Sequence, residues 1–118
     1  MKENVIVDKS LDFAVRVVNL RKFLVKEHNE YVMSKQLLRC GTSIGANVAE
    51  AQQAQSTADF ISKLTIALKE ASETNYWLRL LNATKYITNT EFSSLIADCR
   101  EIEKLLTSII KSSKKTPE

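Results

Sequence analysis

The sequence has little of the two residues that most often interrupt regular structure. Of its 118 residues, one is proline, at position 117, and two are glycine, Gly41 and Gly45. Folds made of β-strands need many tight turns, and those turns draw on glycine and proline. The scarcity favours an all-α fold, and the length fits a single domain over residues 1–118.

Several kinds of site and location are also poorly supported. No apolar run reaches the ~18 residues of a membrane span, and the start lacks a signal-peptide apolar region, so we expect a cytoplasmic protein with no membrane partner. Cys40 and Cys99 lack metal-ligand spacing and are interpreted as small buried residues. The one histidine, His28, ends a predicted helix, and no nucleotide-binding, hydrolase or di-iron motif is present. We therefore expect no enzyme activity, no metal and no cofactor.

Apolar periodicity predicts four long helices and a frayed tail. The predicted helices cover about residues 10–28, 34–53, 57–84 and 90–112, and the tail covers 113–118. Residues 1–7 are interpreted as an arm that packs along the bundle. Four amphipathic helices with short connections predict an up-down-up-down antiparallel four-helix bundle.

Capping residues set the predicted helix starts. Asp8 or Ser10 caps the first helix and Ser34 the second. Capping boxes begin the third and fourth helices, at Ser56-Thr57-Ala58-Asp59 and Thr88-Asn89-Thr90-Glu91.

The second predicted helix has small residues on its buried side. A glycine inside a helix costs about 1 kcal/mol relative to alanine. Gly41 and Gly45 therefore indicate that another helix comes very close. Asn47 continues the buried row and should be at least partly buried. Glu50 and Glu73 border apolar seams, where each either pairs with a basic residue such as Arg39 or reaches solvent.

The first helix has more apolar surface than one bundle core requires. Its first stripe holds Phe13, Val17, Leu20 and Leu24, and its second holds Leu11, Val15, Val18 and Val25. The third helix adds Tyr76 and Trp77. Large leftover apolar surfaces usually mark interfaces, so we expect a homo-oligomer.

The net charge of +3 permits an acidic partner without requiring one. The candidate basic patch lies on the first two helices and consists of Arg16, Arg21, Lys22, Lys26, Lys35 and Arg39. One interpretation is a nucleic-acid interface. The other is a solvated surface of mixed charge, because Asp12, Glu27 and Glu30 interrupt the cations.

The chain resembles the family of 23S ribosomal RNA intervening-sequence proteins, also called four-helix-bundle proteins. The resemblance covers nearly the whole chain and is carried by RCGTSIGANVAEA at residues 39–51, by AQSTADFISKLTIALKEASETNYWLRLL at 54–81 and by the following TKYIT turn. The family usually has glycine where this chain has Ala51.

The resemblance implies a cytoplasmic bundle that assembles into a ring, typically a pentamer. The chain is also similar to the accessory variability protein of diversity-generating retroelements, which implies RNA or DNA and a reverse transcriptase as partners. We expect a ring-forming, non-enzymatic accessory factor that binds nucleic acid. The alternative is a structural or protein-interaction bundle with no nucleic-acid role.

Overall fold

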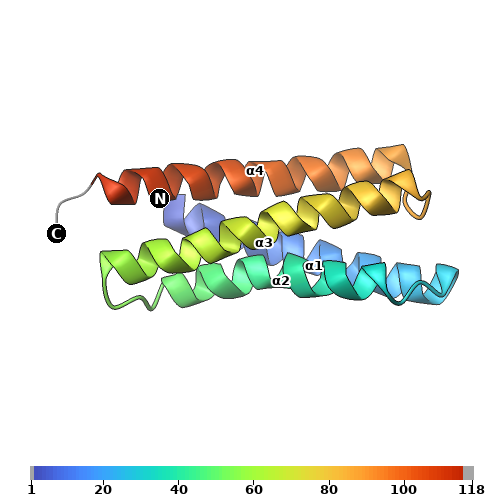
Figure 1. The fold of residues 1–118 in the computed structure, drawn as a ribbon, viewed down its shortest axis with the longest axis horizontal. Helices are drawn as coiled ribbons and strands as arrows, with labels where there is room; N and C mark the ends of the chain where they lie inside the picture. The colour runs from blue at the N-terminus through green and yellow to red at the C-terminus, as the bar shows by residue number, and fades with distance from the viewer. Residues whose placement is uncertain (1, 116–118) are drawn as a thin grey trace.

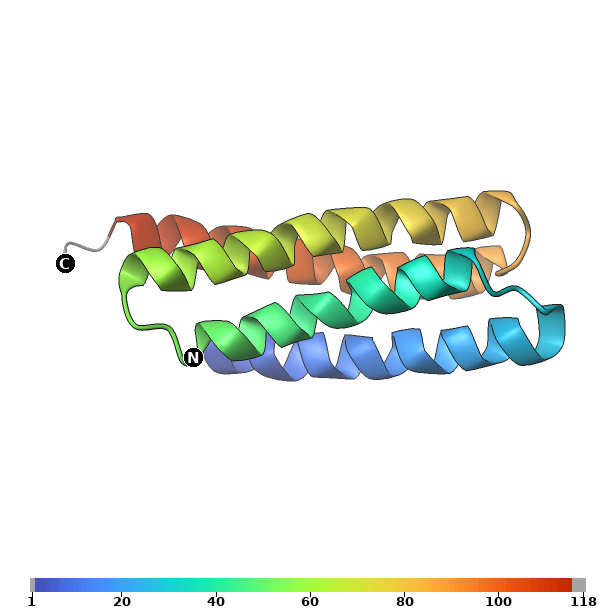
Figure 2. The ribbon, with the colours of Figure 1, turned by 60° about the horizontal axis from the view of Figure 1, so that its bottom comes forward.

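The protein is a bundle of four α-helices. The computed structural model describes residues 2–115, in which the helices are α1 (Lys2–His28), α2 (Met33–Ala51), α3 (Thr57–Ala83) and α4 (Asn89–Lys114), with no strand in that range. Successive helices run in opposite directions and are joined by short connections (Figures 1 and 2). The predicted all-α four-helix bundle is confirmed.

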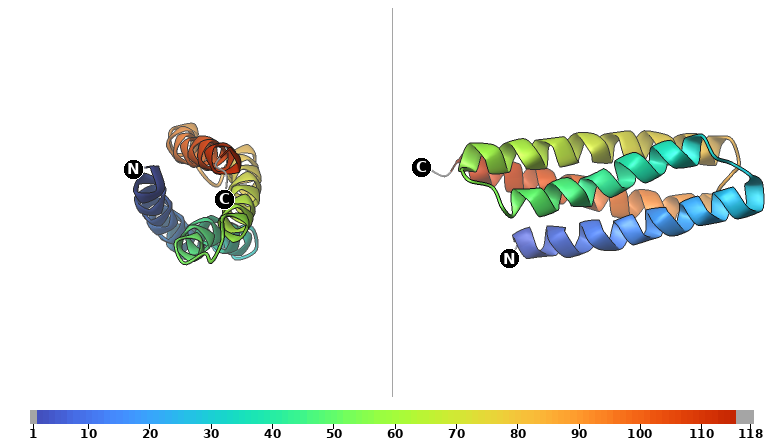
Figure 3. Two further views of the ribbon diagram at one scale, coloured as in Figure 1. Left: turned by 90° about the vertical axis from the view of Figure 1, so that its left-hand side faces the viewer. Right: turned by 90° about the horizontal axis from the view of Figure 1, so that it is seen from below.

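The helices are arranged around the core in chain order. α2 packs on α1 and α3, and α4 packs on α3 and, least extensively, on α1. The end-on view on the left of Figure 3 shows this arrangement, with α1 at the left, α2 at the bottom, α3 at the right and α4 at the top. Two ion pairs cross between α1 and α4: Lys9 Nζ lies 2.9 Å from Glu101 Oε1, and Arg16 Nη1 lies 2.6 Å from Asp98 Oδ2. α1 and α3 are thus diagonal to each other.

α1 begins at Lys2 rather than near residue 10, so the prediction of an N-terminal arm was wrong. Ile6 lies four residues before Ser10 and seven before Phe13, and all three are buried on one helical stripe. Burial of Ile6 therefore extends the helix through Asp8 and Ser10. Ser10 does not cap the helix, and its hydroxyl donates to the carbonyl of Val7 at 3.2 Å.

α2 is capped by Glu30 and not, as the sequence predicted, by Ser34. The helix begins at Met33, so Ser34 lies inside it and is fully buried. The Glu30 carboxylate accepts the backbone N–H groups of Val32, Met33 and Ser34 at 3.1, 3.0 and 2.7 Å. The Ser34 hydroxyl in turn donates to the Glu30 carbonyl at 2.8 Å.

The other predicted boundaries lie within two residues of the observed ones, which is the usual uncertainty of a helix end. α2 ends at Ala51 instead of residue 53, although the family's glycine is absent there. Ser56 accepts the Asp59 N–H at the start of α3, and Thr88 and Glu91 form a complete capping box on α4. α4 continues to Lys114 through the start of the predicted frayed tail, and residues 116–118 lie outside the described residues.

The two glycines allow α2 to lie directly against α1. A Cβ atom at Gly41 would stand 2.9 Å from both methyl groups of Val17, and one at Gly45 would stand 3.3 Å from the Ser10 carbonyl oxygen. Both distances are shorter than ordinary carbon contacts. The glycines thus set the separation of the two helices.

The Gly41 contact predicts that a glycine-to-alanine change will lower the stability of the fold, which is the opposite of its usual effect in a helix. In an open helix, alanine gains about 1 kcal/mol over glycine. Gly41→Ala should instead destabilise the fold by about 1 kcal/mol or more, because the β-branched side chain of Val17 is fully buried and cannot turn aside. Urea unfolding of Gly41→Ala, Val17→Ala and the double variant measures this contact. The double variant should cost less than the two single changes together, and additivity within about 0.5 kcal/mol would contradict the close contact.

Candidate functional site

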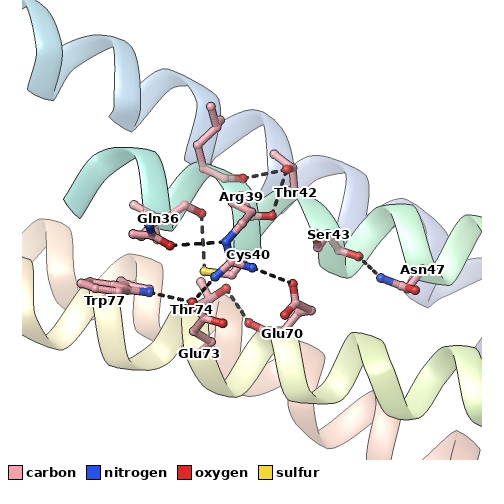
Figure 4. A network of polar contacts seen from close by, with 12 residues as sticks. Gln36, Arg39, Cys40, Thr42, Ser43, Asn47, Glu70, Glu73, Thr74 and Trp77 are labelled. Carbon is pink, nitrogen blue, oxygen red and sulfur yellow. Dashed lines mark hydrogen bonds and ion pairs between the residues drawn. The ribbon is translucent and has the colours of Figure 1, made fainter. Parts of the chain in front are cut away.

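A polar network joins the first part of α2 to the second half of α3 (Figure 4). Arg39 on α2 pairs with Glu73 and lies 3.4 Å from Glu70, both on α3. The indole N–H of Trp77 donates to Glu73 at 3.0 Å. Glu73 is thus a paired, half-buried carboxylate, and the charge of Arg39 is neutralised locally.

The other two polar residues of this seam have separate partners. Glu50 is exposed and lies 3.2 Å from Lys63, so it pairs across α2 and α3 with a cation other than Arg39. Asn47 is half-buried, and its amide donates to the carbonyl of Ser43 at 2.9 Å. The Glu50–Lys63 pair therefore joins α2 to α3, whereas the Asn47 bond lies within α2.

Five of the six candidate cations lie toward one end of the bundle. They are placed on the last two turns of α1 and the first two turns of α2: Arg21, Lys22, Lys26, Lys35 and Arg39. Lys22, Lys26 and Lys35 are exposed. Arg16 is separate, because it turns to α4 and binds Asp98 and the Ser94 hydroxyl at 2.6 and 3.0 Å.

The net positive charge of the chain is concentrated at this end. We define the basic end as residues 19–39 and 73–92, where α1 and α3 finish and α2 and α4 begin (Figure 1). It carries seven of the 17 lysines and arginines but four of the 14 carboxylate side chains. The rest of the sequence carries ten of each, so the net charge of +3 belongs to the basic end. Arg79 and Lys85, which sequence analysis did not include, contribute to it.

The carboxylates at the basic end are mostly engaged in local contacts. Glu30 is 7% exposed and binds the N-terminus of α2, Glu73 binds Arg39, and Glu91 accepts the Thr88 N–H at 2.8 Å. Glu27 is exposed. Glu30, which sequence analysis treated as an interruption of the basic patch, is therefore buried and bound to backbone N–H groups.

A pocket of about 480 Å³ opens at the same end, beside the α3–α4 connection. The ring of His28 lies between Phe23 and Tyr86 in edge-to-face contacts, with centroid distances of 5.3 and 5.7 Å. Lys85, Asn82 and Asn89 also line the pocket. Sequence analysis missed this site because Phe23 and Tyr86 belong to elements far apart in the chain.

Two residues of the second apolar stripe of α1, Leu11 and Val15, face solvent beside the small residues of α2, whereas Val18 and Val25 are half-buried. Leu11 is 62% exposed and Val15 is 53% exposed. A groove of about 300 Å³ runs along this junction, with no charged residue in its lining: Val7, Ser10, Leu11, Ala14, Thr42, Gly45, Ala46 and Ala49. We call this surface, together with Val15, the apolar face.

Both cysteines are free and buried, as the sequence predicted. Burial raises the pKa of the Cys99 thiol to about 12, and burial also raises the pKa of Cys40. Such thiols are poor nucleophiles because they are protonated at neutral pH. Among residues 2–115, no cluster of three or more metal-ligating side chains occurs, and no helix is long and apolar enough to cross a membrane.

Comparison with known proteins gives a consistent family relationship. A family model described as "23S rRNA-intervening sequence protein" matches residues 2–108. A crystal structure of a protein of unknown function from the S23 ribosomal protein family of Bacteroides thetaiotaomicron is 68% identical in sequence. It superposes with a TM-score of 0.93 and covers 94% of this chain and 99% of its own. No curated protein matches the chain.

Proposed function

Because the chain belongs to the 23S rRNA-intervening sequence protein family, we propose that it is a non-enzymatic, ring-forming bundle that binds nucleic acid through its basic end. The observation that carries the proposal is the segregation of charge. A net charge of +3 spread over a whole chain attracts phosphate weakly. The same charge at one end, with Lys22, Lys26 and Lys35 exposed, gives phosphates a defined surface to contact.

Assembly would strengthen this field. In a cyclic oligomer, every copy presents the basic end in an equivalent position around one axis. The apolar face supports association, since exposed Leu11 and Val15 lie beside a groove lined by small residues that another helix can approach closely. The number of subunits, five, comes from the resemblance alone.

Charge removal at the basic end tests the nucleic-acid role. The triple variant Lys22→Gln, Lys26→Gln, Lys35→Gln should bind labelled RNA more weakly, and the slope of log affinity against log salt should fall by about 2–3. The matched control is Lys104→Gln, Lys111→Gln, Lys114→Gln, which removes the same charge from exposed sites on the second half of α4. Fluorescence anisotropy over a salt series measures both.

Two results would count against the proposal. Equal losses in the two triple variants would show that net charge, and not the basic end, governs binding. Absence of binding by the wild-type protein at low salt would favour a protein-interaction bundle with no nucleic-acid role.

A further inference from the structure

We propose that the pocket at the basic end takes an unpaired nucleobase of a single-stranded nucleic acid. This inference rests on the proposed function and specifies the form of nucleic acid that the basic end prefers. The site is the aromatic pocket formed by Phe23 and His28 of α1 together with Tyr86 of the α3–α4 connection.

The pocket has the size and the ring surfaces for a planar base. Its volume of about 480 Å³ lies within the range of small-molecule sites. Phe23 is 40% exposed although it is a large apolar side chain, and His28 is exposed as well. Successive bases of a single strand stack on such exposed rings in proteins that bind single strands. The cost of exposing Phe23 to water would be recovered when a base covers it.

Polar groups around the rings suit the edge of a base. The Asn82 amide nitrogen donates to the Ile87 carbonyl at 3.4 Å and to the side-chain oxygen of Asn89 at 3.0 Å. These bonds position the two amides at the pocket wall. The side-chain nitrogen of Asn89 and the hydroxyl of Tyr86 have no hydrogen-bond partner among the described residues, so both can bond a base edge.

Cations stand where the phosphates of that nucleotide would lie. Lys85 lines the pocket, in a backbone conformation with φ of 67° at the end of α3. Lys22 and Lys26 are exposed on α1, one residue before and three residues after Phe23. Glu91 also lines the pocket, but its carboxylate is bound to the Thr88 N–H. A stacking platform flanked by lysines is the combination that single strands require.

The test compares single-stranded, abasic and duplex probes of equal length by fluorescence anisotropy. The wild-type protein should prefer the single strand to the duplex and to an abasic strand, which keeps the phosphates and lacks the bases. Phe23→Leu and Tyr86→Leu should each weaken single-strand binding about five- to one-hundred-fold, leaving duplex binding and the salt slope unchanged. Tyr31→Leu is the matched control, because Tyr31 is an exposed aromatic residue at the same end, 51% exposed, outside the pocket.

The single histidine provides a direct readout of the pocket. In proton NMR, adding adenosine 5′-monophosphate should shift the His28 ring signals through the ring current of the base. Ribose 5-phosphate, which has no base, should not. This measurement uses a single nucleotide, so it is independent of the affinity of the protein for longer strands.

The outcomes separate this inference from the proposed function. If wild-type protein binds duplex and single strand equally, and the pocket variants change neither, the pocket is overturned and the nucleic-acid role stands. Equal shifts of His28 with both small phosphates would also overturn base recognition. If no probe binds at low salt, both proposals fail.

Discussion

Glu30→Ala should lower the free energy of unfolding by about 2–4 kcal/mol. This is a large effect for a charged residue in a short connection between helices. The change removes the acceptor of three backbone N–H groups at the start of α2. Val32 is the N-cap residue and Met33 and Ser34 begin the first turn, so these N–H groups have no intrahelical partner. The carboxylate also interacts favourably with the positive end of the helix dipole, and that interaction is lost with it.

The pH dependence gives this prediction a second measurement. Burial raises the pKa of Glu30, but the hydrogen bonds from the backbone of Ser34, Met33 and Val32 together outweigh burial and lower the pKa from its ordinary value of 4.5. A lowered folded-state pKa means that the stabilisation is complete above pH 4.5 and is lost as the pH falls below it. The difference in unfolding free energy between wild type and Glu30→Gln should therefore shrink on acidification.

The control for Glu30 is Glu27→Ala. Glu27 is an exposed carboxylate three residues earlier, so its removal should change stability by no more than about 0.5 kcal/mol. Urea unfolding at pH 7 and at pH 4 measures all three variants. If Glu30→Ala and Glu27→Ala had the same small effect, Glu30 would not be the cap of α2.

The sequence was sufficient for the fold because its information is local and periodic. The stripe from Phe13 to Leu24 and the capping box of Thr88 and Glu91 each specify an element without reference to the rest of the chain. The errors arose where a local signal had two readings. Ser10 and Ser34 have the side chain of an N-cap, but each is buried inside a helix. The burial of Ile6 extends α1 upstream of Ser10, and Glu30 caps α2 upstream of Ser34.

The basic end and its pocket could only be partly predicted. Adjacent helices made it possible to group Lys22, Lys26 and Lys35 from the sequence, since α1 and α2 are consecutive. The contact of His28 with Tyr86 joins positions 58 residues apart, and no periodicity encodes it. The burial of Glu30 as the cap of α2 is only weakly predictable, because the sequence shows no more than an acidic residue just before a predicted helix start. These features depend on which helix ends meet, and that is a property of the assembled bundle.

If the proposed oligomer forms, Leu11→Asp should convert it to single folded chains. Leu11 is the most exposed large apolar side chain of the apolar face, and in the assembly that we propose a second copy covers it. A buried, unpaired carboxylate costs several kcal/mol, and every 1.4 kcal/mol weakens association tenfold. Because a cyclic assembly repeats the contact at each interface, the penalty recurs around the ring. The fold of each copy should persist, since Leu11 lies outside the core.

A head-to-tail ring needs a second surface away from the apolar face, and α3 offers one. Exposed Ile66 and Tyr76 lie on α3, which is diagonal to α1 across the bundle.

Light scattering over a dilution series, with circular dichroism to verify helix content, measures the effect of Leu11→Asp. Val32→Asp is the matched control, because Val32 is 74% exposed in the α1–α2 connection and lies outside the apolar face. A Leu11→Asp variant with the wild-type mass would show that the apolar face is not the interface, and a monomeric wild-type protein at micromolar concentration would contradict assembly itself.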